Sequence, residues 1–238
     1  MTDVSVVVPV YRNADTLAEL HRRVASTLDA GRLSFELILV NDACPEGSAR
    51  VIDEIAHRDG RVRTLTMPSN RGQHRALLAG IRLSTARWTV LIDADLQDPP
   101  EAIPLLIREG ERGYPVVFSE RRGNYEPAFR QISGKIYRQV LHIMTGLPRG
   151  AGAFLAIRRD VVERLLLLEG PEPFIVPMVW CTGFPSSSVP VERAFRKSGS
   201  SGWSELGRLG AAWSAFSWVL WNKTRALRTA REIRPTLR

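Results

Sequence analysis

The segment TVLIDADLQDPPE, from Thr89 to Glu101, decides the fold that the sequence predicts. Its apolar run Val90-Leu91-Ile92 is typical of a strand that is buried on both faces of a sheet. Asp93 and Asp95 follow the run, and residues two apart on an extended chain share a face. Because two neighbouring carboxylates repel each other, the pair predicts a site for a cation or a proton at the strand end.

Strand and helix patterns alternate on both sides of this segment. The expected strands are Val4–Val10, Phe35–Asp42, Arg63–Met67, Trp88–Asp93 and Pro115–Glu120. Helical patterns separate them, over residues 16–28 and 48–58, from 72 onward and from 99 onward. This order predicts a single α/β domain with a mainly parallel central sheet and helices on both faces. Ligands of such a domain bind beyond the carboxyl ends of its strands.

Polar residues follow three of these strands at that edge. They are Tyr11-Arg12-Asn13, Asn41-Asp42 and Asp93-Ala94-Asp95. The second half of the chain is less regular: it contains a helical pattern at 129–144, a strand leading into a helix at 152–160, a strand at 189–196, a Gly/Ser-rich loop at 197–204 and a last helix from 205.

Composition narrows the class of protein. The 238 residues carry a net charge of +8, so we expect a partner with phosphates: nucleic acid, anionic lipid or a nucleotide. The alternative is that the excess, much of it in the last sixteen residues, is a solvated tail. No apolar run is long enough to cross a bilayer and no secretory signal opens the chain. The two cysteines, without metal spacing, indicate reduced thiols in a cytoplasmic protein.

Familiar nucleotide motifs are absent from the sequence. It contains neither G-x-G-x-x-G after the first strand nor G-x-x-x-x-G-K-[ST]. Asp93 and Asp95 suit Mg²⁺ or Mn²⁺, which few carboxylates hold together with substrate phosphates. The alternative is a surface turn whose acids cap the next helix, and Asp98, directly before Pro99-Pro100-Glu101, fits that alternative better.

Four segments resemble a known family: VSVVVPVYRN, ELILVNDACPEGS, SNRGQHRALLAGI and LIDADLQDPPE. They are similar to family-2 glycosyltransferases of the glycosyltransferase A fold. The last is most similar to the polyprenyl-phosphate branch, which includes dolichol-phosphate mannosyltransferases and bactoprenol glucosyltransferases. The resemblance runs from Val4 to about Ser217 and is strongest up to Glu101. It implies a nucleotide-sugar-binding half at 1–122, an acceptor-binding half at 123–204, and a C-terminal helix and basic tail at 205–238.

The resemblance also implies how a sugar donor is bound. Pro9 and Tyr11 would line the pocket of the nucleotide base. Asp42 would accept a hydrogen bond from the base, and Arg71 would lie near the nucleotide. Without the resemblance, Pro9 and Tyr11 are an ordinary strand end and Arg71 is a solvated charge.

The catalytic residues implied in the same way are Asp93, Asp95, Arg121 and Arg196. Asp95 would bind the metal ion, Mg²⁺ or Mn²⁺, and Asp93 would contact the ribose or the metal shell. Arg121 belongs to a basic segment, with Arg122, Arg130 and Lys135, that would close over phosphates, although an exposed basic loop explains any one of them equally well.

The acceptor decides whether a catalytic base is needed. A lipid phosphate is already an anion near neutral pH, whereas a hydroxyl needs a base. We find no clear Glu-Asp pair in the second half to supply one, which favours a phosphate. Leu155 and Gly202 favour the opposite, because the branch usually has a cation at each position.

We therefore expect a metal-dependent, inverting glycosyltransferase that transfers sugar from a nucleoside-diphosphate sugar to a polyprenyl phosphate. The first alternative is transfer to a soluble small molecule, as in natural-product biosynthesis. The second is a non-catalytic basic protein that binds nucleic acid or a membrane surface. Tryptophans precede the basic tail, at Trp203, Trp213, Trp218 and Trp221, and they suit either a membrane interface or ordinary packing. A cytoplasmic enzyme, peripheral at the inner membrane surface, is the expectation.

Overall fold

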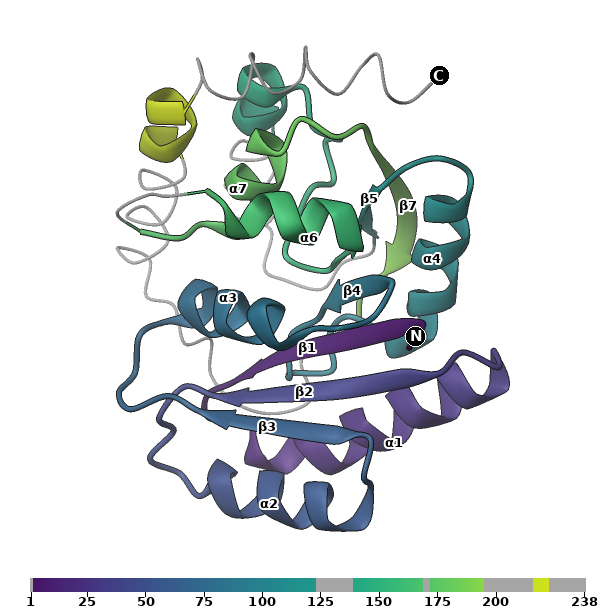
Figure 1. Ribbon diagram of the computed structural model, residues 1–238, viewed down its shortest axis with the longest axis vertical. Helices are drawn as coiled ribbons and strands as arrows, with labels where there is room; N and C mark the ends of the chain where they lie inside the picture. The colour runs from purple at the N-terminus through teal and green to yellow at the C-terminus, as the bar shows by residue number, and fades with distance from the viewer. Residues whose placement is uncertain (1, 123–138, 169–171, 195–215, 223–238) are drawn as a thin grey trace.

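The computed structural model describes residues 2–122, 139–168, 172–194 and 216–222 (Figure 1). The strands are β1 (Val4–Val10), β2 (Phe35–Asn41), β3 (Val62–Thr66), β4 (Trp88–Leu91), β5 (Val116–Arg122), β6 (Leu155–Arg158) and β7 (Ser186–Glu192). The helices are α1 (Ala14–Ala30), α2 (Ser48–Arg58), α3 (Gln73–Leu83), the short η1 (Pro100–Ala102), α4 (Ile103–Glu111), α6 (Arg159–Leu166) and α7 (Ile175–Cys181). Residues 139–145 and 216–222 are also helical.

The seven strands form one sheet in the order β3-β2-β1-β4-β6-β5-β7. Strand β6 runs antiparallel to both of its neighbours, β4 and β5, and every other pair is parallel. The predicted α/β domain with a mainly parallel sheet is confirmed. Strands from both predicted halves share this sheet, and the predicted boundaries at 122/123 and 204/205 adjoin or lie within residues outside the described ranges.

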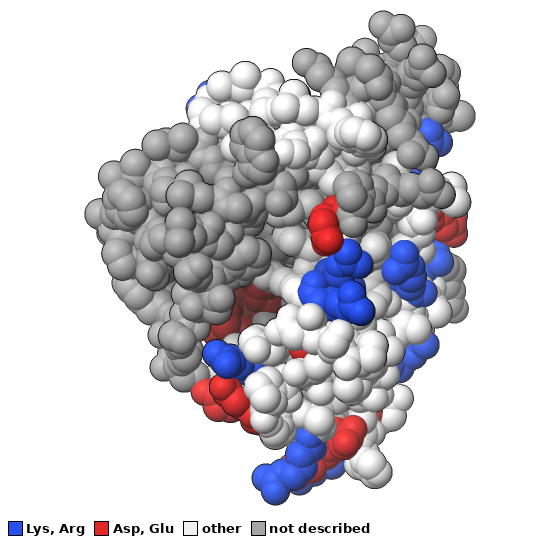
Figure 2. Space-filling view, turned by 90° about the vertical axis from the view of Figure 1, so that its left-hand side faces the viewer, with Lys and Arg blue, Asp and Glu red and all other residues white. Residues whose placement is uncertain are grey.

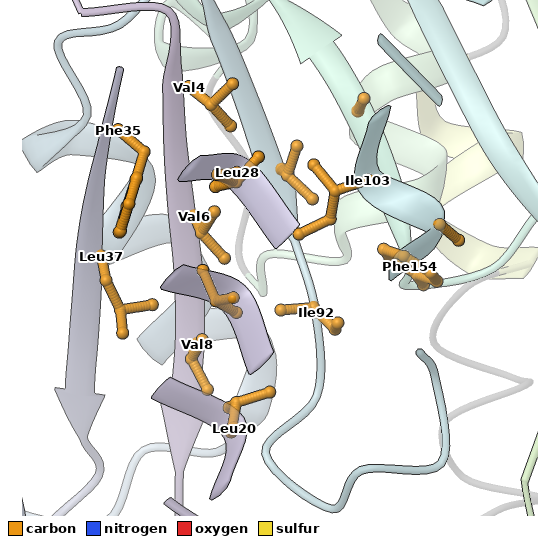
Figure 3. Packing of buried hydrophobic residues seen from close by; sticks show 14 of the residues in the cluster. Val4, Val6, Val8, Leu20, Leu28, Phe35, Leu37, Ile92, Ile103 and Phe154 are labelled. Atoms are coloured by element: carbon orange, nitrogen blue, oxygen red, sulfur yellow. The ribbon is translucent and has the colours of Figure 1, made fainter. Parts of the chain in front are cut away.

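Both faces of the sheet are covered, as the alternation of side chains in β1 requires. Val4, Val6 and Val8 pack in one core cluster with residues of α1, α2 and α4 (Figure 3). Val7 points to the other face, into a second cluster with residues of α3, α6 and α7. Leu37 and Ile38 of β2 divide between the clusters in the same way. The central strands are therefore apolar on both faces, which explains their unbroken hydrophobic runs.

Helix α3 lies unusually close to the sheet, and this position matters for the site at its N-terminus. A Cβ atom added to Gly80 would lie 2.3 Å from Cγ1 of Val7. Real side chains do not approach so closely, so only glycine allows the helix to pack here. The first residue of α3, Gln73, is thereby held beside the ends of β1 and β4.

Three element predictions need correction. Strand β4 ends at Leu91 rather than Asp93, because after the bond from Ile92 N to Val7 O (3.2 Å) the chain turns away from the sheet. Helix α7 was not expected from the sequence. Strand β7 begins at Ser186, three residues before the predicted strand, and ends at Glu192, although residues 195 and 196 of that prediction lie outside the described ranges.

Candidate active site

The polar residues that follow β1, β2 and β4 meet at one edge of the sheet, as predicted. The backbone N–H of Asp42 donates to Val10 O at 3.0 Å, which joins the ends of β1 and β2. The hydroxyl of Thr16 donates to Ala94 O at 2.6 Å, which joins the start of α1 to the loop after β4. Figure 2 looks onto this edge and shows acidic side chains set back from the surface, with basic side chains beside them.

Backbone strain gathers at the same edge. Arg12, Ala43 and Leu96 have φ angles of 60°, 50° and 59°, and each follows a different strand of the three. An L-residue in this left-handed region costs about 1–2 kcal/mol. Strained residues of this kind persist where the surrounding structure fixes them, and they cluster at functional sites. Strain at all three strand ends supports a site at this edge.

Asp93 and Asp95 lie in the turn that follows β4, not on the strand itself. The prediction that they share a face of a strand is therefore wrong. The two carboxylates are nevertheless close enough to interact, as predicted. Asp95 is buried, and its Oδ1 accepts the backbone N–H of Gln97 at 3.1 Å. Oδ1 of Asp93 accepts the side-chain amide of Gln73 at 2.7 Å.

The electrostatics of Asp93 mark the acidic end of the site. Burial is the largest cause that raises the pKa of Asp93, to about 6, and the charges of Asp95 and Asp98 add to it. Arg121 and Arg193 oppose the rise. The side chain of Asp93 is still 24% exposed, so a ligand arriving from solvent can reach it. A site that concentrates negative charge in this way favours a cation.

Asp98 is buried between two arginines. Its Oδ2 accepts Nη2 of Arg121 at 2.9 Å, and its Oδ1 lies 3.3 Å from Nε of Arg193. The second contact is an ion pair without the alignment of a hydrogen bond. The expectation that Asp98 caps the next helix is wrong, since Pro99 holds the cap position and no side chain bonds there. Arg121 also approaches Asp93, with 3.9 Å between Nη2 and Oδ2.

A second carboxylate group lies at the end of β2. Both oxygens of Asp42 accept backbone N–H groups, from Arg71 and from Gly72, each at 2.8 Å. Asp42 therefore anchors the loop between β3 and α3, a role that the sequence did not indicate. Each carboxylate oxygen has two lone pairs, so this anchoring leaves capacity for another donor. Tyr11 lies across the edge, partly buried, with the Arg12 guanidinium 5.3 Å from its ring centroid.

Comparison with known proteins places the chain in a family. Residues 5–166 match the model of glycosyl transferase family 2. The chain belongs to this family. It is 35% identical over 205 residues to an undecaprenyl-phosphate 4-deoxy-4-formamido-L-arabinose transferase of Klebsiella pneumoniae, and 33% identical over 206 residues to the transferase of that name from Proteus mirabilis. The matches cover 84% and 85% of this chain but 62% and 63% of those relatives.

Two solved glycosyltransferase structures share the fold of this chain. Glucosyl-3-phosphoglycerate synthase from Mycobacterium tuberculosis, in complex with Mn²⁺, uridine diphosphate and phosphoglyceric acid, superposes with a TM-score of 0.66 over 94% of this chain and 78% of that one, at 20% identity. Mannosyl-3-phosphoglycerate synthase from Rubrobacter xylanophilus gives 0.65 over 94% and 75%, at 15% identity. The predicted glycosyltransferase A fold is thus confirmed.

The structure brings together most of the residues predicted for a family-2 site. Asp93, Asp95 and Arg121 lie around one turn, and the carboxylate of Asp42 accepts a hydrogen bond from the backbone N–H of Arg71. Pro9 is the last residue but one of β1 and is partly buried. Arg196, Arg130 and Lys135 lie outside the described residues. Leu155 stands where the resemblance to the polyprenyl-phosphate branch led us to expect a cation, and it is fully buried in the core on β6.

Gln73 and Arg193 were missed by the sequence analysis. Gln73 contacts the predicted Asp93, and Arg193 contacts Asp98, which was not predicted to belong to the site. Neither residue stands in a sequence pattern that marks it. His74 packs its ring on Phe174 with 4.1 Å between centroids. Burial lowers the pKa of His74 to about 4, so this side chain is neutral near pH 7.

The acids of this candidate site can be compared with the ligands that a divalent cation needs. Within the described ranges, no group of three or more His, Cys, Asp or Glu side chains is arranged to hold a metal ion. Mg²⁺ and similar ions need only one or two carboxylates when substrate phosphates and water complete the shell. Asp95, with Asp93 beside it, supplies such a pair.

Proposed function

We propose that the protein is an inverting glycosyltransferase that transfers a sugar from a nucleoside-diphosphate sugar to a polyprenyl phosphate. The observation that carries the proposal is the Asp93/Asp95 pair at the sheet edge, beside the buried Asp98 and its two arginines. This edge offers a site for a metal cation next to the positively charged guanidinium groups of Arg121 and Arg193, which suits a diphosphate leaving group. The names of the relatives, which are undecaprenyl-phosphate sugar transferases, support the lipid acceptor.

The donor binds across the ends of β1, β2 and β4 in this proposal. Pro9 and Tyr11 line the base pocket, Asp42 accepts a base N–H, and Arg71 lies near the nucleotide. Asp95 and Asp93 would hold Mg²⁺ or Mn²⁺, and the similar glucosyl-3-phosphoglycerate synthase, which was solved with Mn²⁺ or Mg²⁺ and uridine diphosphate, supports this assignment. When bound, the cation neutralises charge that develops on the leaving diphosphate. Arg121 adds a fixed positive charge from the side of β5.

The acceptor needs positioning rather than activation. A phosphate monoester carries at least one full negative charge near pH 7, so it attacks the anomeric carbon without a base. Attack on the face opposite the departing diphosphate inverts that carbon. We assign Arg121 to orienting the diphosphate of the donor and Arg196 to orienting the phosphate of the acceptor. A soluble acceptor with a hydroxyl nucleophile would instead require a general base in the same space.

We further propose that the protein works at a membrane surface. No helix in the parts of the chain that the structure describes is long and apolar enough to span a bilayer. Helices 139–145 and 216–222 lie at the end of the molecule farthest from α2 (Figure 1). They expose apolar side chains: Ile143 is 72% exposed, Leu220 64% and Trp221 80%. Exposed aromatic and aliphatic residues of this kind insert into the interfacial region of a bilayer.

The deciding experiment is transfer of labelled sugar by the purified protein. Donors are first selected by calorimetry with Mn²⁺, and each that binds is offered a short-chain polyprenyl phosphate or 3-phosphoglycerate. We expect a lipid-linked product that requires metal and disappears in Asp95→Asn. Sugar transfer to phosphoglycerate alone would refute the lipid acceptor. Absence of any metal-dependent nucleotide binding would refute the glycosyltransferase itself.

Membrane contact has its own test, with a matched pair of tryptophans. Trp221 is exposed, whereas Trp218 is 5% exposed and belongs to the core cluster above the sheet. Vesicles of phosphatidylglycerol and phosphatidylcholine should recruit the wild type. Trp221→Ser should weaken recruitment and leave the melting temperature unchanged, whereas Trp218→Ser should lower the melting temperature. Equal recruitment of wild type and Trp221→Ser would refute the contact.

A further inference from the structure

Asp98 differs from the other acids at the site because the protein encloses it completely. Its exposure is 0%, and its side chain lies between arginines that come from two other parts of the fold. A buried carboxylate without solvent must be paired, and here Arg121 and Arg193 provide the pairing. Only two residues separate Asp98 from Asp95 in the sequence, so this buried group adjoins the proposed metal site without belonging to it.

The two arginines tie distant strands to the loop after β4. Arg121 is the sixth residue of β5, and Arg193 directly follows β7. The backbone of the same region is also joined: Arg193 N donates to Arg122 O at 3.0 Å, and Ala194 N donates to Gln97 O at 2.9 Å. Asp98 therefore lies at the junction of β5, the chain after β7 and the acidic turn.

The position of the Arg121 guanidinium is what this junction determines. One Nη atom reaches both Asp98, at 2.9 Å, and Asp93, at 3.9 Å. An arginine side chain has several rotatable bonds, and an unanchored one loses conformational entropy when it binds a ligand. The bond to buried Asp98 restricts this freedom before any ligand arrives. Groups fixed in advance in this way stabilise developing charge without reorganising.

We infer that Asp98 is a positioning residue for the reaction: it holds Arg121 beside Asp93, so that a fixed cation faces the diphosphate of the donor. This inference rests on the proposed function. It assigns no contact between Asp98 and substrate. Arg193 braces the other carboxylate oxygen and thereby keeps Asp98 in the orientation that serves Arg121.

Asp98→Asn separates positioning from simple charge, because the two accounts predict opposite signs. The substitution keeps the shape and removes one negative charge. If Asp98 acted only through its charge, the site would become more positive and would bind a diphosphate at least as tightly. If Asp98 positions Arg121, the variant should bind more weakly and transfer sugar more slowly. Misplacement of a catalytic group by about 1 Å lowers rates by on the order of 100-fold.

The experiment is a double-mutant cycle with Arg121→Ala, read by calorimetry of UDP and GDP with Mn²⁺ and by sugar transfer. Asp98→Asn alone should reduce transfer by roughly 10–100-fold. In the Arg121→Ala background the same change should alter transfer by no more than about twofold, within the scatter seen for independent effects. Asp160→Asn is the matched control, because Asp160 also pairs with an arginine, Arg158 at 2.7 Å, and takes no part in the site.

Each outcome bears on a different claim. A wild type that binds neither nucleotide with Mn²⁺ overturns the proposed function and this inference with it. A wild type that binds, together with an Asp98→Asn variant of equal or higher affinity and rate, overturns the inference alone. Equal effects of Asp98→Asn with and without Arg121 also overturn it. If Asp98→Asn does not fold, Arg193→Lys replaces it: this change preserves charge, so slower transfer supports positioning and unchanged transfer refutes it.

Discussion

Replacing Asp42 tests whether one carboxylate both anchors a loop and binds the donor. In Asp42→Ala the backbone N–H groups of Arg71 and Gly72 lose the acceptor to which each bonds at 2.8 Å, and Gly72 keeps only its longer bond, 3.1 Å, to Oδ1 of Asn70. A hydrogen bond to a charged group contributes about 1.5–3 kcal/mol. Because Arg71 and Gly72 are exposed, water replaces part of the loss, and the lower end of the range applies to each bond. The free energy of unfolding should therefore fall by about 3 kcal/mol.

The assay combines thermal melting with calorimetry. For a chain of this size, 3 kcal/mol corresponds to a fall in melting temperature of roughly 6–12 °C. Asp42→Asn keeps one acceptor and should show about half of that fall. If the carboxylate also accepts a base N–H, the dissociation constant of the nucleotide should rise by about tenfold or more in folded protein. Asp53→Ala, an exposed acid on α2, should change neither quantity.

Two results would refute the reasoning about Asp42. A melting temperature within about 2 °C of the wild type would show that the two bonds to the loop contribute little to stability. A lowered melting temperature with unchanged nucleotide affinity would leave the anchoring role and remove the role in base recognition. The two measurements therefore judge the two roles separately.

Three further changes test the scaffold around the site. Asp59→Asn should lower the free energy of unfolding at pH 7, and its difference from the wild type should shrink as the pH falls below about 4. Hydrogen bonds from Arg61 lower the pKa of Asp59 beneath its ordinary 3.8, so the stabilisation that Asp59 contributes is present above that pH and is lost on acidification. Urea titrations of both proteins at pH 3 and pH 7 will check this. Glu36→Gln should lower the free energy of unfolding by about 2–4 kcal/mol, because buried Glu36 accepts Thr85 N at 2.8 Å and pairs with Arg63 at 2.9 Å; no loss in denaturant melts would contradict this. Ala43→Gly should raise it by about 0.5–1 kcal/mol, since glycine relieves the φ of 50° but has more freedom when unfolded; a lower melting temperature would show that Ala43 is not strained.

The strands of the sheet could be predicted because each is marked by a run of residues that are neighbours in the sequence. Unbroken apolar runs in β1 and β2 indicate strands that are buried on both faces, and turns follow where polar residues interrupt the runs. The acidic pair was predictable for the same reason, since Asp93 and Asp95 directly follow such a run. The end of β4 was not, because it depends on where the chain leaves the ladder with β1 and β6. Helix α7 is short and its residues are buried almost throughout, so it lacks the polar face that marks a surface helix.

The roles of the individual acids required the tertiary structure. In sequence, Asp42 and Asp93 both directly follow apolar strands, and the prolines after Asp98 indicated a helix cap that the structure does not contain. In the fold, Asp42 accepts two backbone amides, and Asp98 is enclosed by arginines from β5 and from beyond β7. Asp93 accepts the side-chain amide of Gln73 and keeps 24% of its side chain exposed. Burial and partners thus give Asp42 and Asp98 a structural role, which Asp42 combines with the proposed contact to the base, and leave Asp93 accessible from solvent. A strand-end acid predicts where a site lies, but only its contacts across the fold decide whether it holds the protein together or meets the ligand.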